Sequence, residues 1–291
     1  MPKGELASRL IVAAIGIPMA VMIIYWGGWY LGVLMAAAAG LSAGEYYSLS
    51  SVRGSRPLRW LGIGVAVLLP LVATAHPSYH DFAQVAYTLV LAGTLVALAL
   101  VIWRRWPGGQ PLAAAATTMG GALYTGGTLS FWILLRALPE QTSDAATAFH
   151  GAALLIFPIW VTWLGDSFAY GIGTRFGKTK LIEAVSPKKT VVGSLGGLAG
   201  SVAVGVLYSW LWLSELPVYG LSLMGAAGVS ALIAPVGQVG DLAESVLKRE
   251  AGVKDSSNLL PGHGGVLDRL DALYFTVPFT YALFLLIQHW S

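Results

Sequence analysis

Most of the polar residues that suit catalysis lie in a short stretch near the C-terminus. From Lys254 to Asp271 the chain reads KDSSNLLPGHGGVLDRLD, which combines two basic residues, three Asp and one His. Asp268 and Asp271 are three residues apart, so on a helix they share a face. Carboxylates bind hard divalent cations, and basic side chains bind phosphate oxygens. The stretch therefore indicates a metal-dependent reaction on a phosphate-containing substrate.

A second group of polar residues precedes this stretch. The sequence GQVGDLAESVLKREAG predicts a helix that continues out of a membrane span and ends near Gly252. Asp241, Ser245 and Lys248 follow at helical spacing, so one face presents a carboxylate, a hydroxyl and an ammonium group. A solvated amphipathic helix would show the same pattern. Because a hairpin separates Asp241 from Asp268, we expect these two carboxylates to hold one divalent cation together.

Two further polar features lie upstream. Asp166 follows an apolar run, and an ionisable residue at membrane depth indicates function. The alternative is a solvated helix end, paired with Arg175. Lys188 and Lys189, in the sequence SPKKT, place two ammonium groups in one turn, which suits phosphate oxygens. The alternative there is a positively charged anchor at the lipid headgroups.

The composition indicates that these residues belong to a membrane protein. Hydrophobic residues make up 56% of the chain and charged residues 11%, which leaves too little polar surface for a soluble globule of 291 residues. The mean hydropathy is +0.70. Cysteine is absent, which excludes disulfides, thiolate nucleophiles and cysteine-ligated zinc. The net charge of +3 reports membrane orientation, and it gives no support to nucleic-acid binding.

Continuous apolar runs can cross a bilayer as helices. A hydrocarbon core roughly 30 Å thick needs about 20 apolar residues in helical form. Runs that are continuous rather than alternating favour helices over a β-barrel. The expected spans are 9–27, 30–50, 59–75, 83–103, 112–138, 148–170, 195–214, 219–240 and 271–289. Glycines between Gly193 and Gly200 favour close helix packing. The sequence thus predicts an all-α polytopic membrane protein with about nine transmembrane helices.

Basic residues fall in every second loop between these spans, a pattern that marks the cytoplasmic side. Among Lys and Arg residues, the other loops contain only Arg136. The N-terminus is therefore expected in the cytoplasm and the C-terminus outside. Two long polar loops, 171–194 and 241–270, then face the cytoplasm. We accordingly expect N-terminal transmembrane helices in 1–147 and a catalytic transmembrane region in 148–291.

The two C-terminal segments resemble the signature of the phosphatidate cytidylyltransferases, also called CDP-diacylglycerol synthases. That signature begins Ser-x-hydrophobic-Lys-Arg, continues with Lys-Asp and ends His-Gly-Gly-x-x-Asp-Arg-x-Asp. The matching positions are Ser245, Lys248, Arg249, Lys254, Asp255, Pro261, His263, Gly264, Gly265, Asp268, Arg269 and Asp271. The GDSFAY and SPKKT stretches are also similar to the family. Glu45, in GEYYSLS, is similar to an acidic position of the family, whereas Val192 stands where the family's SPKKTxEG pattern has an acid.

The resemblance implies that CTP and phosphatidate react to give CDP-diacylglycerol and pyrophosphate, with Mg²⁺ as cofactor. A phosphate oxygen of phosphatidate attacks the α-phosphorus of CTP, so no protein nucleophile is needed. The resemblance also implies an integral protein of the inner cell membrane whose active site faces the cytoplasm. CTP would then enter from water while the acyl chains stay among the membrane lipids. A second cation and a homodimer are left open.

The resemblance further implies a role for each matching residue. The expected metal ligands are Asp241 and Asp268, with Asp166 as a third contributor. The expected catalytic residues are Asp241, Lys248, Asp268 and Arg269. Binding of phosphates is expected from Lys188, Lys189, Lys248, Arg249, Lys254 and Arg269. Positioning of the substrates is expected from Ser245, Asp255, His263 and Asp271.

Two other protein classes were weighed against this one. A transporter for an anionic solute would also place charges among helices, but it is expected to show internal repeats and broken helices at the membrane midplane. A CDP-alcohol phosphotransferase shares the substrate CDP-diacylglycerol, but its Asp-Gly-x-x-Ala-Arg signature is missing. Both classes predict no incorporation of CTP into lipid.

Overall fold

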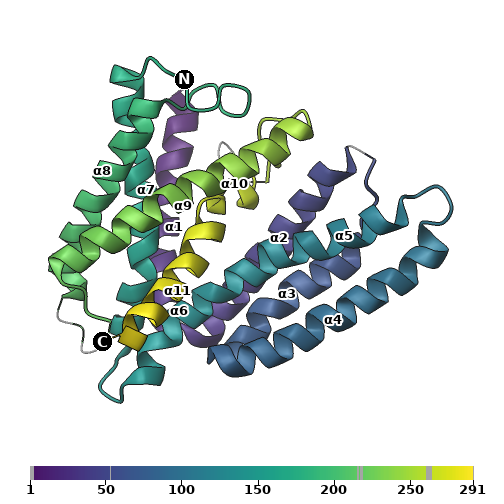
Figure 1. The fold of residues 1–291 in the computed structure, drawn as a ribbon, viewed down its shortest axis with the longest axis horizontal. Helices are drawn as coiled ribbons and strands as arrows, with labels where there is room; N and C mark the ends of the chain where they lie inside the picture. The colour runs from purple at the N-terminus through teal and green to yellow at the C-terminus, as the bar shows by residue number, and fades with distance from the viewer. Residues whose placement is uncertain (1–2, 53, 215, 217–218, 260–263, 291) are drawn as a thin grey trace. The chain divides into compact units, whose positions relative to one another are not determined.

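The structure is a computed structural model of the chain, and it describes residues 3–52, 54–214, 216, 219–259 and 264–290. Within these residues the regular structure is helical, and an isolated antiparallel bridge joins Lys180 to Thr190. The helices, labelled as in Figure 1, are α1 (Lys3–Trp26), α2 (Gly28–Ser51), α3 (Arg59–Ala75), α4 (Tyr79–Arg104), α5 (Pro111–Ala122), η1 (Leu123–Gly127), α6 (Thr128–Thr142), α7 (Ala148–Phe176), α8 (Val191–Tyr208), η2 (Ser209–Leu213), α9 (Leu223–Glu250), α10 (Val266–Leu270) and α11 (Leu273–Trp290).

The predicted all-helical membrane architecture is confirmed in its coarse form. Each expected apolar run coincides with a helix or with consecutive helical segments. Five stretches are long and apolar enough to cross a membrane: Tyr79–Arg104, Ala148–Phe176, Val191–Leu213, Leu223–Glu250 and Val266–Ile287. The count of nine spans and their orientation stay predictions.

Helices extend into both ends of the predicted loop 171–194. Helix α7 continues to Phe176 and α8 already begins at Val191, so the irregular segment is 177–190. Gly173 is a packing residue of α7, since a Cβ there would lie 3.2 Å from the Cα of Gly193. Within the predicted loop 241–270, α9 ends at Glu250, as expected from Gly252, and α10 occupies the last five residues.

The chain divides into two compact units. The first contains Met1–Arg136 together with Asp255–Arg269, and the second contains Ala137–Lys254 together with Leu270–Ser291. The segment Asp255–Arg269 therefore belongs with the N-terminal helices. The predicted division of labour between 1–147 and 148–291 stays a prediction.

Helices α2, α3 and α5 of the first unit pack around a buried tyrosine. Tyr47 is 1% exposed, and its hydroxyl donates to the Thr118 carbonyl at 2.6 Å. A Cβ on Gly62 would overlap the Tyr47 ring, so only glycine lets α3 approach α2 this closely. The Thr118 hydroxyl in turn accepts from the amide of Leu58 at 2.7 Å, which fixes the start of α3.

Arg136, the basic residue that departs from the alternation of charged loops, is a buried helix cap. It is 4% exposed, and its guanidinium donates to the carbonyls of Ile24 at 2.9 Å and Tyr25 at 2.8 Å. These carbonyls end α1 and lack partners within that helix. Gly27 follows with φ +62 and a Cβ position 3.1 Å from the guanidinium carbon. The side chain therefore serves α1 rather than marking a side of the membrane.

Helices α7, α8, α9 and α11 of the second unit pack through small residues. A Cβ on Gly165 would overlap the Ser201 side chain, and one on Gly205 would overlap that of Ser230. The hydroxyl of Thr162 donates to that of Thr276 at 3.3 Å, which joins α7 to α11. The expectation that the glycines entering α8 serve helix packing is confirmed, because Gly196, Gly197 and Gly200 lie against Ile172, Ala169 and Phe168 of α7.

Candidate active site

Three carboxylates of the second unit lie within electrostatic reach of one another. Asp166 comes from α7, Asp241 from α9, and Asp271 from the residues just before α11. The negative charge of Asp241 acts on both of the other carboxylates, and that of Asp166 also acts on Asp271. Like charges at this proximity repel and favour a bound cation. The structure thus brings Asp166, Asp241 and Asp271 together, and the predicted metal binding by Asp166 and Asp241 stays a prediction.

Lys189 supplies a positive charge to this carboxylate cluster. Its Nζ atom lies 2.7 Å from Oδ2 of Asp241, with both side chains about one quarter exposed. Its charge also attracts the carboxylate of Asp166. The opposite oxygen of Asp241 accepts a long hydrogen bond, 3.4 Å, from the Ser245 hydroxyl. An ammonium group beside carboxylates suits a substrate that arrives as a polyanion with a cation.

The turn that carries Lys189 is held by backbone pairing. The amide of Leu181 donates to the Lys189 carbonyl at 3.0 Å, and the amide of Val191 donates to the Thr179 carbonyl at 3.0 Å. Thr190 then caps α8, since its hydroxyl accepts from the amide of Gly193 at 3.1 Å. Neighbouring Lys188 is exposed. The SPKKT turn therefore points one lysine at Asp241 and leaves the other in solvent.

Asp166 is an exposed residue within α7 rather than at the end of that helix. Helix α7 continues past Asp166 to Phe176. Arg175 lies with its guanidinium 5.7 Å from the centre of the Phe176 ring, as a cation–π contact. The choice between a functional role for Asp166 and a solvated end of the membrane span stays a prediction.

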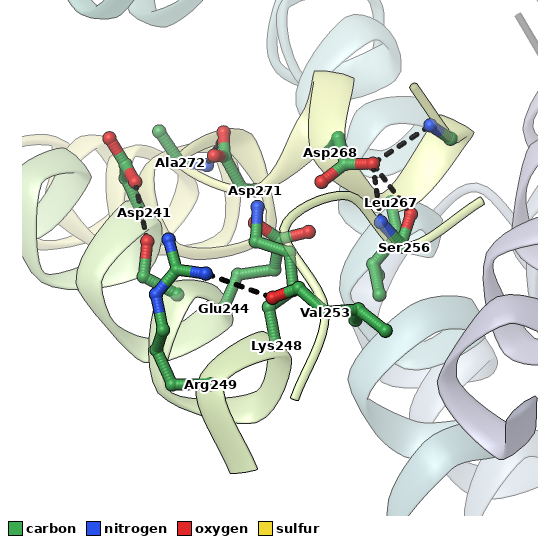
Figure 2. A network of polar contacts seen from close by, with 12 residues as sticks. Asp241, Glu244, Lys248, Arg249, Val253, Ser256, Leu267, Asp268, Asp271 and Ala272 are labelled. Carbon is green, nitrogen blue, oxygen red and sulfur yellow. Dashed lines mark hydrogen bonds and ion pairs between the residues drawn. The ribbon is translucent and has the colours of Figure 1, made fainter. Parts of the chain in front are cut away.

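Lys248 forms a buried ion pair that sequence reasoning missed. Its Nζ atom lies 2.5 Å from Oε2 of Glu244, one helical turn earlier on α9. Glu244 has no exposed surface and Lys248 is 9% exposed. Figure 2 shows Asp241, Glu244 and Lys248 along α9. The Glu-to-Lys spacing of four residues signals such a pair in the sequence, but it does not say that the pair is buried.

Arg249 ties the end of α9 to its surroundings. Its Nε donates to the Val185 carbonyl at 3.2 Å, and another guanidinium nitrogen donates to the Val253 carbonyl at 2.9 Å (Figure 2). Lys254 next along the chain is exposed. The predicted binding of phosphate by these two residues stays a prediction.

Asp268 shapes a turn in the first unit. Its Oδ2 atom accepts from the amide and the hydroxyl of Ser256 and from the amide of Gly265, each at 2.8 Å (Figure 2). Gly264 adopts φ +81, a left-handed conformation that glycine accommodates without strain. Because Asp268 and Asp241 belong to different units, their shared binding of a cation stays a prediction.

The other predicted site residues belong to the segment Asp255–Arg269 or contact it. Asp255 and Arg269 are exposed at the two ends of their segment. Pro261 and His263 lie outside the described residues. Glu45, which the sequence singles out only by resemblance, accepts hydrogen bonds from this segment, for example from the amide of Leu267 at 2.8 Å. An acidic residue within an apolar run was the available signal.

A preformed cage of three or more metal-ligating side chains is not found among the residues that the structure describes. This arrangement fits Mg²⁺ nevertheless, because Mg²⁺ is usually held by one or two carboxylates together with water and substrate phosphates. Asp166 and Asp241 supply such hard oxygen donors within one unit. Further ligands would then come from a bound polyphosphate.

Comparison with known proteins identifies relatives over nearly the whole chain. The model of the cytidylyltransferase family matches residues 7–287. A phosphatidate cytidylyltransferase from Synechocystis sp. is 34% identical over 296 residues, which cover 96% of each chain. The chloroplastic phosphatidate cytidylyltransferase 4 of Arabidopsis thaliana is 32% identical over 96% of this chain and 73% of its own length. A phosphatidate cytidylyltransferase from Thermotoga maritima is 41% identical over 47% of this chain and 51% of its own.

Proposed function

The chain belongs to the cytidylyltransferase family, and from the relative that matches 96% of each chain we infer that it is a phosphatidate cytidylyltransferase. It transfers the cytidylyl group of CTP to phosphatidate, which gives CDP-diacylglycerol and pyrophosphate for phospholipid biosynthesis. The enzyme is thus a nucleotidyltransferase. The resemblance in the signature residues is confirmed at the level of the family.

The observation that supports a site for this reaction is the ion pair between Lys189 and Asp241 beside Asp166. A phosphate oxygen of phosphatidate forms a new bond to the α-phosphorus of CTP, while the bond from that phosphorus to the bridging oxygen breaks and pyrophosphate leaves. Both reactants are anions, so the barrier is lowered chiefly by alignment and by neutralised charge. Lys189, in the connection between α7 and α8, and the carboxylates on α7 and α9 supply both the alignment and the neutralising charge.

Each basic residue of the site takes a share of the phosphate charge in this proposal. Lys189 lies on the carboxylate cluster, and Lys188 extends into solvent beside it, where CTP arrives. Further phosphate contacts are assigned to Lys248, Arg249, Lys254 and Arg269. Orientation of the substrates is assigned to Ser245, Asp255, His263 and Asp271.

Asp166 and Asp241 are the residues of this chain that would hold Mg²⁺. When bound, the ion supplies positive charge to the phosphates of CTP. Asp268 is the other predicted ligand, and its carboxylate also organises the turn at Ser256 and Gly265. A second cation and a homodimer remain compatible with this arrangement.

The proposal places the protein in the inner cell membrane with nine spans, a cytoplasmic N-terminus and an external C-terminus. The alternation of basic loops supports this orientation. The segment 177–190 and the C-terminal end of α9 then face the cytoplasm, where CTP is dissolved. Phosphatidate reaches the same level from the lipid.

Incorporation of radiolabelled CTP into lipid by the purified protein tests the proposed function. With phosphatidate and Mg²⁺, labelled CDP-diacylglycerol and one pyrophosphate per turnover are expected. A CDP-alcohol phosphotransferase would instead consume CDP-diacylglycerol in the presence of an alcohol and release CMP. A transporter would yield no new lipid. Absence of labelled lipid from correctly folded protein would overturn the proposal.

A further inference from the structure

Glu45 of α2 lies at the centre of a hydrogen-bond network in the first unit. It is 7% exposed, and both of its carboxylate oxygens are used. Oε1 accepts from the Ser257 hydroxyl at 2.6 Å and from the Val266 amide at 3.1 Å. Oε2 accepts from the Ser256 hydroxyl at 3.1 Å and from the Leu267 amide at 2.8 Å.

The four donors come from the two ends of one segment. Ser256 and Ser257 open the turn, whereas Val266 and Leu267 begin α10. Amides at the start of a helix have no partner within that helix, and a buried carboxylate needs several donors. Charge-assisted hydrogen bonds of this kind are among the stronger polar contacts in proteins. Glu45 therefore closes the segment by joining its ends.

Ser256 and Gly265 contact the Glu45 carboxylate at the point where it joins the ends of the segment. The Ser256 hydroxyl lies between two carboxylates, 3.1 Å from Glu45 and 2.8 Å from Asp268, so its one hydrogen is shared between them. A Cβ on Gly265 would overlap both the Ser256 hydroxyl and the Glu45 carboxylate oxygens. Glycine at this position leaves the space through which Glu45 reaches the segment.

We propose that Glu45 is a positioning residue for the cytidylyl transfer. By joining the ends of the segment 256–267, its carboxylate holds Asp255, Asp268 and Arg269 in a single arrangement before substrate arrives. Preorganisation of binding groups lowers the entropic cost of reaching the transition state. The inference rests on the proposed function, because the segment carries residues assigned to the substrates. It gives the N-terminal helices a part in the reaction.

A labelling experiment tests whether Glu45 holds the segment, independently of activity. The chain has no cysteine, so a Leu267→Cys substitution places a single thiol at a position of the segment that has no exposed surface. In Glu45→Gln the amide keeps the size, but it has one acceptor oxygen and presents N–H groups to other donors. Opening of the segment should then be easier, and the thiol should react about tenfold faster.

Matched controls separate this local effect from a general loosening of the fold. A Leu69→Cys thiol is buried in α3 of the same unit, where Leu69 is 1% exposed, and its labelling rate should not change with Glu45→Gln. Glu45→Asp keeps the charge but withdraws the oxygens, so it should give an intermediate rate. Should Glu45→Gln fail to insert into the membrane, Glu45→Asp supplies the comparison.

Kinetics of the folded protein test whether the held segment matters to the reaction. In Glu45→Gln, kcat per folded molecule should fall about tenfold, and across the Asp, Gln and Ala variants the fall should follow the labelling rate. A residue that only stabilises the fold would lower the melting temperature while the folded fraction kept its kcat. Asp81→Asn alters an exposed carboxylate on α4. This control variant should leave kcat and the labelling rate unchanged.

The outcomes are distinct. Equal labelling rates in the unaltered protein and in Glu45→Gln would overturn the holding role of Glu45. Faster labelling with unchanged kcat would overturn its role in the reaction. Failure of the unaltered protein to make CDP-diacylglycerol would instead overturn the proposed function and, with it, the positioning role, whereas the labelling contrast would still report whether Glu45 holds the segment.

Discussion

The Nζ atom of Lys189 lies 2.7 Å from Oδ2 of Asp241, so a turn between α7 and α8 neutralises a carboxylate of α9. The neighbouring Lys188 is exposed. Two adjacent lysines of the same motif therefore face different surroundings. We therefore expect Lys188 and Lys189 to contribute to different steps of the reaction.

Lys189→Ala should lower kcat by about 100-fold, the loss typical of removing one group that stabilises transition-state charge. Lys188→Ala should act mainly on the KM for CTP, because its ammonium group meets the substrate from solvent. Initial rates at varied CTP concentration measure both effects. Lys178→Ala removes an exposed lysine from the same connection and serves as the control. Normal kinetics in a correctly inserted Lys189→Ala variant would favour the lipid-anchor interpretation of the motif.

Asp166→Asn and Asp241→Asn should each abolish most of the activity and raise the Mg²⁺ concentration needed for half of the remaining rate. The amide keeps the size of the side chain but removes the charge that attracts the ion. If the two residues act on one ion, the double variant should be little worse than either single variant. Titration of activity with Mg²⁺ measures this.

The same titration decides the place of Asp268. Asp268→Asn should share the raised Mg²⁺ requirement if its carboxylate joins Asp241 at the ion. A lower rate with an unchanged Mg²⁺ requirement would assign Asp268 to the turn at Ser256 alone. Because Asp241 and Asp268 are predicted to hold one cation together, we expect Asp268→Asn to raise the Mg²⁺ requirement.

Glu244→Gln should destabilise the protein by about 3 kcal/mol, since it removes the carboxylate that is ion-paired with the buried Lys248 ammonium group. Denaturant unfolding in detergent micelles measures the change in the free energy of unfolding. Glu183→Gln alters an exposed carboxylate of the same unit and should change this free energy by less than about 0.5 kcal/mol. A stable Glu244→Gln protein would mean that Lys248 is compensated by other groups.

Single-cysteine variants test the orientation in the membrane. Thiols introduced by Lys180→Cys and Asn258→Cys, at exposed positions, should react only with a reagent that reaches the cytoplasm. The thiol of Asp144→Cys, between α6 and α7, should react from outside. The opposite pattern would reverse the predicted topology and place the site away from cytoplasmic CTP.

Hydropathy was sufficient to locate the helices because membrane spans require long apolar runs. The span predicted for 59–75 coincides with α3. The predicted bounds at 171 and 194 differ from the helix ends at Phe176 and Val191, because a helix can continue beyond the apolar run that marks its span. Gly173 and Gly193 permit close packing of these helix ends. Local pattern and tertiary packing gave conflicting signals at these positions.

The site was predictable to the extent that its residues follow local spacing. Asp241, Ser245 and Lys248 share a face of one helix, and their types alone indicated phosphate chemistry. The partner of Lys248 was not identified, because burial of Glu244 depends on neighbouring helices. The role of Glu45 could not be read from the sequence, since its hydrogen-bond partner Leu267 lies 222 residues away along the chain.

The cap on α1 links the first helix to the order in which the chain is made. The carbonyls at the end of α1 receive their donors from Arg136, and 112 residues separate Arg136 from Ile24. At about 5–20 residues per second, a ribosome needs on the order of 6–22 s to cover that distance. During this interval the end of α1 must be hydrated or held by the insertion machinery. Completion of the first helix thus waits for translation to reach the sixth.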